Sequence, residues 1–243
     1  MTRTALPDGT IAPTDHATDC LMIFWTTITT FGDTVVMLPA ALAIAAWLAA
    51  SSARRLALYW IALFGSAAAL VTLSKIAFVG WGIGLPGFDF TGISGHATFA
   101  LAVIPTMLYL AWPAACSGGR APGVLIGIAF GLLIGISRLT LHAHSASEVV
   151  AGCALGLAAS LGFIGLASAH ARPRLNPMAA AGYSIVLIAG LYAQAAPTQH
   201  WIERVALYLS GHAQPFRRAN LPALALRPAP VTDWQRESAS DPR

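Results

Sequence analysis

Charged side chains are scarce in this sequence. Of its 243 residues, 10% are Asp, Glu, Lys or Arg, whereas 56% are hydrophobic. A soluble globular domain carries about 25% charged residues. A chain with so few charges could not cover a surface that faces water. The composition therefore excludes an ordinary soluble domain and indicates lipid as the solvent.

Lysine and cysteine are also rare. Lys75 is the only lysine among fourteen basic residues, and the three cysteines, Cys20, Cys116 and Cys153, are scattered. Their odd number and their scatter argue against a disulfide framework and against a cysteine metal site. The net charge of +4 comes without a basic patch interleaved with aromatic residues, so we expect no nucleic-acid partner. The richness in Ala, Gly and Arg favours a bacterial source.

What the sequence does contain is long apolar runs. Six of them have about the 17–25 residues that a membrane crossing requires, at roughly 34–51, 56–78, 95–113, 122–140, 146–168 and 178–196. We therefore predict an all-α, polytopic membrane protein with about six transmembrane helices. Small residues four apart, among them Gly127 and Gly131 and then Gly152 and Gly156, predict helix faces that pack closely in lipid.

The ends of the chain are more polar than its middle. We divide the chain into a polar tail (1–20), a membrane domain (21–196) and a Pro- and Arg-rich tail that we expect to be flexible (197–243). The run from Leu21 to Phe31 is too short to span a bilayer and is expected to form an interfacial helix that ends at Gly32-Asp33. A short surface helix is expected from Trp201 to Ser210.

The short loops predict the orientation in the membrane. One side of the predicted bundle carries five basic residues and no acidic one: Arg54, Arg55, Arg120, Arg172 and Arg174. The other side carries a mixture of charges. Because cytoplasmic loops are enriched in Lys and Arg, the arginine side is expected to be cytoplasmic. The opposite face would then be directed to the periplasm, from the bacterial inner membrane.

Most ionisable residues of the apolar region belong to that periplasmic face. Between Leu56 and Ala169 the charged residues are Lys75, Asp89, Arg120, Arg138 and Glu148. All of them except Arg120 are expected at this face, together with His96, His142 and His144. An ionisable group beside a bilayer is costly enough to mark a functional site.

The positions of these residues at helix ends favour an anion as the ligand. Lys75 is expected at the end of the second span and Ser137-Arg138 at the end of the fourth. Ser94-Gly95-His96 opens the third span, and His144 precedes the fifth. Helix N-termini offer unpaired N–H groups and a positive dipole end. Together with the cations of Lys75 and Arg138, they predict a phosphate site.

Two histidines and a carboxylate supply a mechanism. His144 and Glu148 are four residues apart and share a helix face. The carboxylate can therefore hold one ring nitrogen while the other attacks phosphorus. His96 can protonate the leaving oxygen, and Lys75, Arg138 and nearby N–H groups would stabilise the phosphoryl charge. Because the sequence has no carboxylate cluster, we expect neither a metal ion nor another cofactor.

These residues resemble the signature of the type-2 phosphatidic acid phosphatase superfamily. That signature has three parts: Lys, six residues, Arg-Pro; then Pro-Ser-Gly-His; then Ser-Arg, five residues, His, three residues, Asp. Here the second part reads Ile93-Ser94-Gly95-His96. The third reads Ser137-Arg138, five residues, His144, three residues and Glu148. The similarity covers roughly residues 20–170, which implies the helical core of that family.

The resemblance implies a phosphohistidine mechanism, with His144 as nucleophile, His96 as general acid and Glu148 as the carboxylate that orients the nucleophile. The phosphate-binding residues it implies are Lys75, Ser94, Gly95, Ser137 and Arg138. Membrane members of the family dephosphorylate lipid phosphates or lipid pyrophosphates. The expected partners are therefore a lipid phosphate substrate and membrane lipids.

This sequence departs from the family pattern at three places. Gly82 and Ile83 stand where the first part has Arg-Pro, Ile93 replaces Pro, and Glu148 replaces Asp. The missing guanidinium matters most, because a charge-assisted contact contributes about 1.5–3 kcal/mol, or about one to two powers of ten in binding. Two alternatives to hydrolysis therefore stay open. One is a phosphotransferase that uses the same phosphohistidine, and the other is a phosphate-lipid-binding relative with impaired catalysis.

Several of these residues also have simpler explanations. Lys75 could extend from the end of a span toward the membrane surface. Ser145 and Glu148 have the spacing of a helix capping box. His142 and Asp89 match no part of the signature and are expected to be solvated loop residues.

Overall fold

Helices make up the regular structure of the chain. The computed structural model describes residues 16–51, 53–112, 119–170 and 198–220, and these ranges contain no strand. The helices are α1 (His16–Thr30), α2 (Thr34–Ala50), α3 (Arg54–Trp81), α4 (Gly95–Ala111), α5 (Ala121–Thr140), α6 (Ala146–Ser168) and α8 (Thr198–Ser210). Short 3-10 turns lie at Pro86–Phe88 and Arg218–Asn220. The all-α prediction is confirmed.

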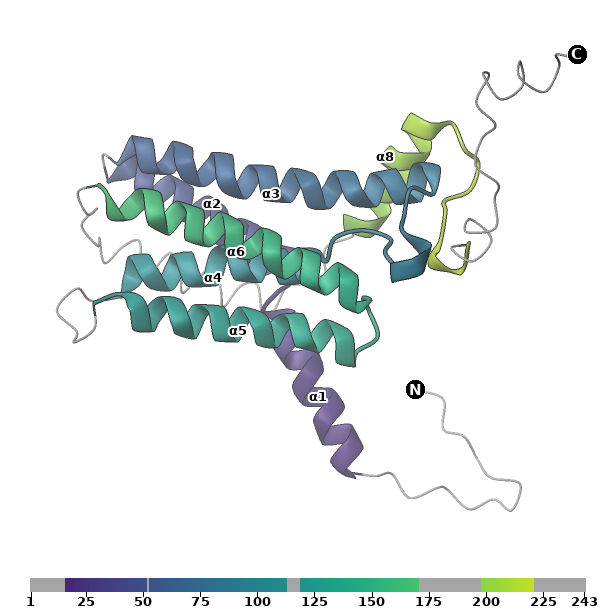
Figure 1. Cartoon of the computed structure of the whole chain (residues 1–243), viewed down its shortest axis with the longest axis horizontal. Helices are drawn as coiled ribbons and strands as arrows, with labels where there is room; N and C mark the ends of the chain where they lie inside the picture. Colours follow the sequence, from purple (N-terminus) through teal and green to yellow (C-terminus); the bar gives the residue numbers. More distant parts are fainter. Residues whose placement is uncertain (1–15, 52, 113–118, 171–197, 221–243) are drawn as a thin grey trace, which may run out of the picture.

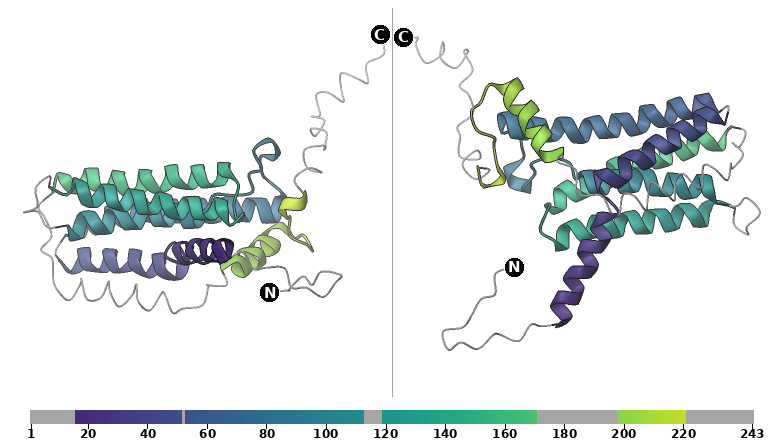
Figure 2. Two further views of the ribbon diagram at one scale, coloured as in Figure 1. Left: turned by 90° about the horizontal axis from the view of Figure 1, so that it is seen from below. Right: turned by 180° about the vertical axis from the view of Figure 1, so that it is seen from behind.

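Helix α4 lies at the centre of a bundle. It packs against α2, α3, α5 and α6, and the five helices run side by side along the molecule (Figure 1, Figure 2). Four consecutive residues of α4, Ala100, Leu101, Ala102 and Val103, are fully buried. Since they point in different directions around the helix axis, α4 is enclosed by its neighbours on all sides, which its uniformly apolar sequence allows.

Glycines let α5 and α6 approach α4 closely. A Cβ added at Gly127 would lie 2.6 Å from Cα of Pro105, and one added at Gly156 would lie 2.5 Å from the carbonyl oxygen of Thr98. Gly152 faces α4 in the same way. No side chain fits at these distances, so the glycines form the close-packing faces that their spacing predicts.

Within the described parts of the chain, four helical stretches are long and apolar enough to cross a membrane: Asp19–Ala50, Arg54–Trp81, Ala121–Thr140 and Ala146–Ser168. Helix α4, with 17 residues, is shorter but also apolar. The chain is therefore a polytopic, all-helical membrane protein. The sixth expected span, 178–196, lies outside the described residues.

The segment expected to be an interfacial helix forms α1. It ends at Thr30, close to the expected Gly32-Asp33, and leaves the bundle at an angle to α2 (Figure 1). Asp33 then caps α2, because its side chain accepts a hydrogen bond of 3.0 Å from the N–H of Val35. The location of α1 at the membrane interface stays a prediction.

Helix α3 is longer than the apolar run that predicts it. We expected 56–78 with Lys75 at its end, but the helix continues through apolar residues to Trp81, so Lys75 lies nearly two turns before the end. The helix ends at Gly82, whose φ of 69° and ψ of 20° are left-handed. Glycine adopts this conformation at little cost and is the usual residue at such helix ends.

Five helix ends meet at one end of the bundle. Helices α2, α4 and α6 begin there, α3 and α5 end there, and α8 lies across this end against α3 (Figure 1). The contact between α8 and α3 includes an apolar cluster of Phe78, Val79 and Ala206. After α8, Nδ1 of His212 lies 2.9 Å from the carbonyl oxygen of Gly80.

Part of the C-terminal segment is helical and packs on the bundle, whereas the flexibility expected of residues 197–243 stays a prediction. The surface helix predicted at Trp201–Ser210 is present within α8, and residues 198–220 pack on the bundle. The reason is an apolar face on α8, on which Ile202 and Ala206 are four residues apart and contact α3. Residues 221–243 lie outside the described part, and the domain limits at 20 and 196 stay predictions.

Candidate active site

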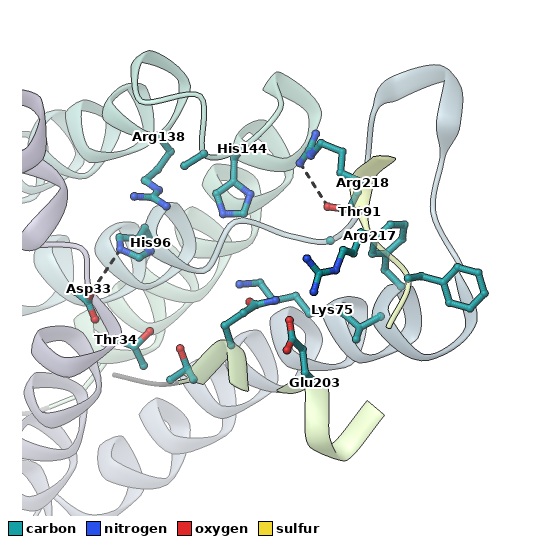
Figure 3. A pocket seen from close by; sticks show the side chains of 17 residues that line it. Asp33, Thr34, Lys75, Thr91, His96, Arg138, His144, Glu203, Arg217 and Arg218 are labelled. Atoms are coloured by element: carbon teal, nitrogen blue, oxygen red, sulfur yellow. Dashed lines mark hydrogen bonds and ion pairs between the residues drawn. The ribbon is translucent and has the colours of Figure 1, made fainter. Parts of the chain in front are cut away.

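A cavity of about 550 Å³ lies at the end of the bundle where the helix ends meet. Its polar and charged lining residues are Asp33, Thr34, Lys75, Thr91, His96, Arg138, His144, Thr198, Gln199, Glu203, Arg217 and Arg218. Figure 3 shows their side chains around a common space. Of the eight expected site residues, Lys75, His96, Arg138 and His144 line this cavity, and Glu148 contacts His144.

His144 lies just before α6 and is held by Glu148. Its Nδ1 lies 2.7 Å from Oε2 of Glu148, the contact that a spacing of four residues predicts. A carboxylate at this distance fixes the ring tautomer with the proton on Nδ1. In the neutral ring Nε2 then carries the lone pair, and the ring lines the cavity (Figure 3). His144 is therefore equipped to act as a nucleophile.

Glu148 is a fully buried carboxylate with several donors around it. Oε1 accepts hydrogen bonds from the N–H of Thr91, at 2.7 Å, and from its hydroxyl group. Oε2 accepts from the N–H of Ser145 at 3.2 Å and from Nη2 of Arg218 at 2.7 Å. The capping box with Ser145 is present as well. Capping α6 and orienting His144 are therefore two roles of one side chain.

His96 reaches the cavity from the first turn of α4. Its Nε2 lies 3.8 Å from Oδ2 of Asp33, whose other oxygen caps α2. Both side chains are about one-fifth exposed. The carboxylate can pair with the ring when the ring carries its second proton, which is the form that a general acid needs.

Two cations lie beside the histidines. Nη1 of Arg138 donates a hydrogen bond of 3.0 Å to Oγ1 of Thr29 in α1, and the guanidinium lines the cavity. Nζ of Lys75 lies 4.0 Å from the place of a Cβ on Gly95, so the ammonium group lies beside the N-terminus of α4. Full positive charge and a helix N-terminus together suit an anion.

The two expected serines lie behind the cavity rather than in its lining. Ser94 is fully buried, and its N–H donates a hydrogen bond of 3.1 Å to the carbonyl oxygen of Glu148. Ser137 is also buried, and its hydroxyl donates to the carbonyl oxygen of Ile134 at 2.6 Å. These contacts position the adjoining helix ends. A direct contact of either serine with phosphate stays a prediction.

Other residues of the cavity were missed by the sequence analysis. Thr91, Asp33 and Glu203 carry no motif, and Arg217 and Arg218 follow a helix that was expected to lie on the surface. Arg218 contacts Glu148, from which it is 70 residues apart in the sequence. Helical periodicity relates only residues within a few turns of each other, so it could not predict this contact. The available signal was a pair of arginines seven and eight residues after the end of an amphipathic helix.

His142 and Asp89, which were expected to be solvated loop residues, do not line the cavity. His142 is exposed, has a φ of 51° and does not line the cavity. Asp89 is exposed and forms an ion pair with Arg218. Among the described residues, no group of three His, Cys, Asp or Glu side chains is placed to hold a metal ion.

The groups around the cavity are of the kinds that phosphoryl transfer uses. A carboxylate-bound imidazole can attack phosphorus, a second imidazole can protonate the leaving oxygen, and cations can stabilise the charge on the remaining oxygens. Each group comes from a different helix end, so the set exists only in the assembled bundle.

The amino-acid sequence is similar to a known protein family and to a protein of another organism. A family model described as the PAP2 superfamily matches residues 79–172. The chain is also similar to a protein of Klebsiella pneumoniae described as an uncharacterized 22.5 kDa protein in the cps region. The two are 36% identical over 202 residues, which cover 81% of this chain and 97% of that protein. No solved structure matches the chain.

Proposed function

The chain belongs to the PAP2 superfamily of phosphatase-type membrane enzymes, and we propose that it hydrolyses a lipid phosphate or lipid pyrophosphate through a phosphohistidine. One observation carries the proposal. Nδ1 of His144 lies 2.7 Å from the buried Glu148 carboxylate, and the same cavity holds His96, Lys75 and Arg138. This geometry combines a nucleophile, an acid and an anion site in one place.

In the first step, Nε2 of His144 attacks the terminal phosphorus. An N–P bond forms and the P–O bond to the leaving group breaks. His96 gives its proton to the leaving oxygen. The imidazole of His144 gains positive charge as it attacks, and the Glu148 carboxylate, which accepts the Nδ1–H, stabilises that charge.

In the second step, water replaces the enzyme nitrogen. Neutral His96 takes a proton from the water molecule as the oxygen attacks phosphorus and the N–P bond breaks. Inorganic phosphate leaves, and both histidines return to their starting protonation states. Lys75 and Arg138 stabilise the equatorial oxygens in both steps because their charges face the same phosphoryl group.

The surroundings of the cavity support a lipid as the substrate. Trp81, Ile83, Leu85 and Phe88, in and after the last turn of α3, are 44–71% exposed. Exposed apolar side chains at the end of a bundle that holds the cavity can contact an acyl or prenyl chain, while the head group of the same lipid enters the polar cavity. The arginine-rich loops at the other end favour a periplasmic location of this site in the bacterial inner membrane.

The experiment that tests the proposal uses two histidines of one loop. Phosphate release by the purified chain in detergent is measured from phosphatidic acid, phosphatidylglycerophosphate, undecaprenyl pyrophosphate and lipid A. His144→Asn is expected to lower the rate by more than about a thousandfold, because it removes the nucleophile. His142→Asn, which changes an exposed neighbour outside the cavity, should leave it nearly unchanged.

Equal rates for His144→Asn and the parent would disprove the proposed mechanism. With labelled substrate, the same assay also separates hydrolysis from transfer. Label that appears on a second lipid or on a sugar would identify a phosphotransferase. Saturable binding of a lipid phosphate without any release would identify a binding protein.

A further inference from the structure

The first motif leaves a gap in the anion site. In the family pattern a guanidinium stands seven positions after the lysine, and here that position is Gly82. The structure places Gly82 at the C-terminal end of α3 in a left-handed conformation. The end of α3 therefore offers the cavity one cation, Lys75, from two turns before the helix end, and no side chain from position 82.

The C-terminal segment covers this end of α3. Nδ1 of His212 lies 2.9 Å from the carbonyl oxygen of Gly80, and the N–H of Phe216 donates a hydrogen bond of 2.9 Å to the carbonyl oxygen of Val79. We call residues 211–218 the C-terminal strap. One side-chain contact and one backbone hydrogen bond thus fix the strap to the last turn of α3, next to Gly82.

The strap ends with two arginines that line the cavity. Arg218 already has four acceptors. Nη1 donates to the carbonyl and the carboxylate of Asp89, and Nη2 donates to Oγ1 of Thr91 and to Oε2 of Glu148. These contacts fix the end of the strap to the α3–α4 loop and to α6. Arg218 thus holds the strap in place.

Arg217, the neighbouring arginine, lines the same cavity. In Figure 3 its guanidinium points into the cavity, on the side where Lys75 and Glu203 lie and across from His96. The anchored neighbours, Phe216 on α3 and Arg218 on Glu148, hold its backbone on both sides. A guanidinium in this place can form two parallel hydrogen bonds with a phosphate, a geometry that an ammonium group cannot offer.

We propose that Arg217 supplies the phosphate-binding guanidinium that position 82 lacks, so that the C-terminal strap completes the anion site. This inference rests on the proposed function, because it takes phosphate as the ligand of the cavity. It extends that function by making a residue outside the three motifs a part of substrate binding.

The test measures binding of inorganic phosphate to the full chain in detergent, by calorimetry. Arg217→Ala should weaken binding by roughly ten- to a hundredfold, the loss of one charge-assisted contact. Arg217→Lys keeps the positive charge but cannot form two parallel hydrogen bonds, so its phosphate affinity should lie between those of Arg217→Ala and the parent. Arg204→Ala is the matched control, because Arg204 is an exposed arginine of α8 that lies over Trp201, 5.9 Å from its ring centroid.

Unchanged phosphate affinity in Arg217→Ala would overturn the inference, as would an equal loss in Arg204→Ala. If Arg217→Ala does not fold, Arg217→Gln provides the same measurement with a side chain of similar reach. The two proposals can fail separately. Phosphate release that depends on His144 but not on Arg217 would reject only the strap, and Arg217-dependent binding without any turnover would reject only the phosphatase.

Discussion

Replacement of Glu148 by glutamine tests the role of the buried carboxylate directly, because it changes the charge of the side chain and hardly changes its shape. The side chain is fully buried and its two oxygens accept hydrogen bonds from His144, Thr91, Ser145 and Arg218. Glutamine has nearly the same shape but replaces one oxygen by an amide that can only donate. Whichever way the amide turns, at least one buried donor loses its acceptor and meets another donor.

The expected cost has a catalytic and a structural part. In Ser-His-Asp enzymes, changing the orienting carboxylate to an amide lowers kcat by about 10⁴, because the histidine tautomer is no longer fixed. We expect a loss of about 10² to 10⁴ here. Hydrogen bonds to charged groups contribute about 1.5–3 kcal/mol each. Since Arg218 is 40% exposed and regains water, we expect a loss of about 2–4 kcal/mol in unfolding free energy.

The assay compares phosphate release and thermal unfolding in one detergent. Asp19→Asn makes the same acid-to-amide change at an exposed position of α1 and should alter neither quantity. His144→Asn should abolish turnover with a smaller loss of stability than Glu148→Gln, because it removes one of the hydrogen bonds to the Glu148 carboxylate and leaves the others in place. If Glu148→Gln kept more than about a tenth of the parental kcat, the reasoning about its carboxylate would be refuted.

Three further results are expected. Gly156→Ala should lower the unfolding free energy by about 1–3 kcal/mol, because its Cβ would lie 2.5 Å from the carbonyl oxygen of Thr98. The control Gly165→Ala should not lower it, because nothing lies within 4 Å of the added Cβ. Equal unfolding temperatures for the two variants would contradict this prediction. Asp33→Asn should lower kcat several-fold, because asparagine carries no charge to pair with His96. Stability should be unchanged, because asparagine also caps helix N-termini. Unaltered turnover would argue against the pairing of Asp33 with His96. Excess EDTA should leave phosphate release unchanged, and a loss restored by a divalent cation would contradict a metal-independent mechanism.

The bundle could be predicted from the sequence because its signals are local and strong. Helices α2, α5 and α6 begin and end within about two residues of the apolar runs that predict them. The end of α3 was placed too early because a charged residue, Lys75, looked like the limit of the span. The helix continues because the residues after it are apolar and Gly82 is the first that stops it.

The candidate site could be predicted only where its parts are close in sequence. His144 and Glu148 meet because four residues make one helical turn. Arg218 and Glu148 meet because two distant segments pack, and no periodic pattern reports such a contact. Asp33 belongs to the same class, since its proximity to His96 arises from the packing of α2 on α4.

The C-terminal strap has a consequence for biosynthesis. Helix α6 ends at the end of the bundle opposite the cavity, whereas α8 lies beside the cavity (Figure 1). Translation delivers the helices in order, so the histidines and Glu148 can assemble while the strap is still inside the ribosome. The carboxylate then lacks Arg218 until a further 70 residues have been made, and the cavity lacks Arg217 over the same interval. A nascent chain at that stage would hold the two histidines and Glu148 without the two arginines that the strap brings to the cavity.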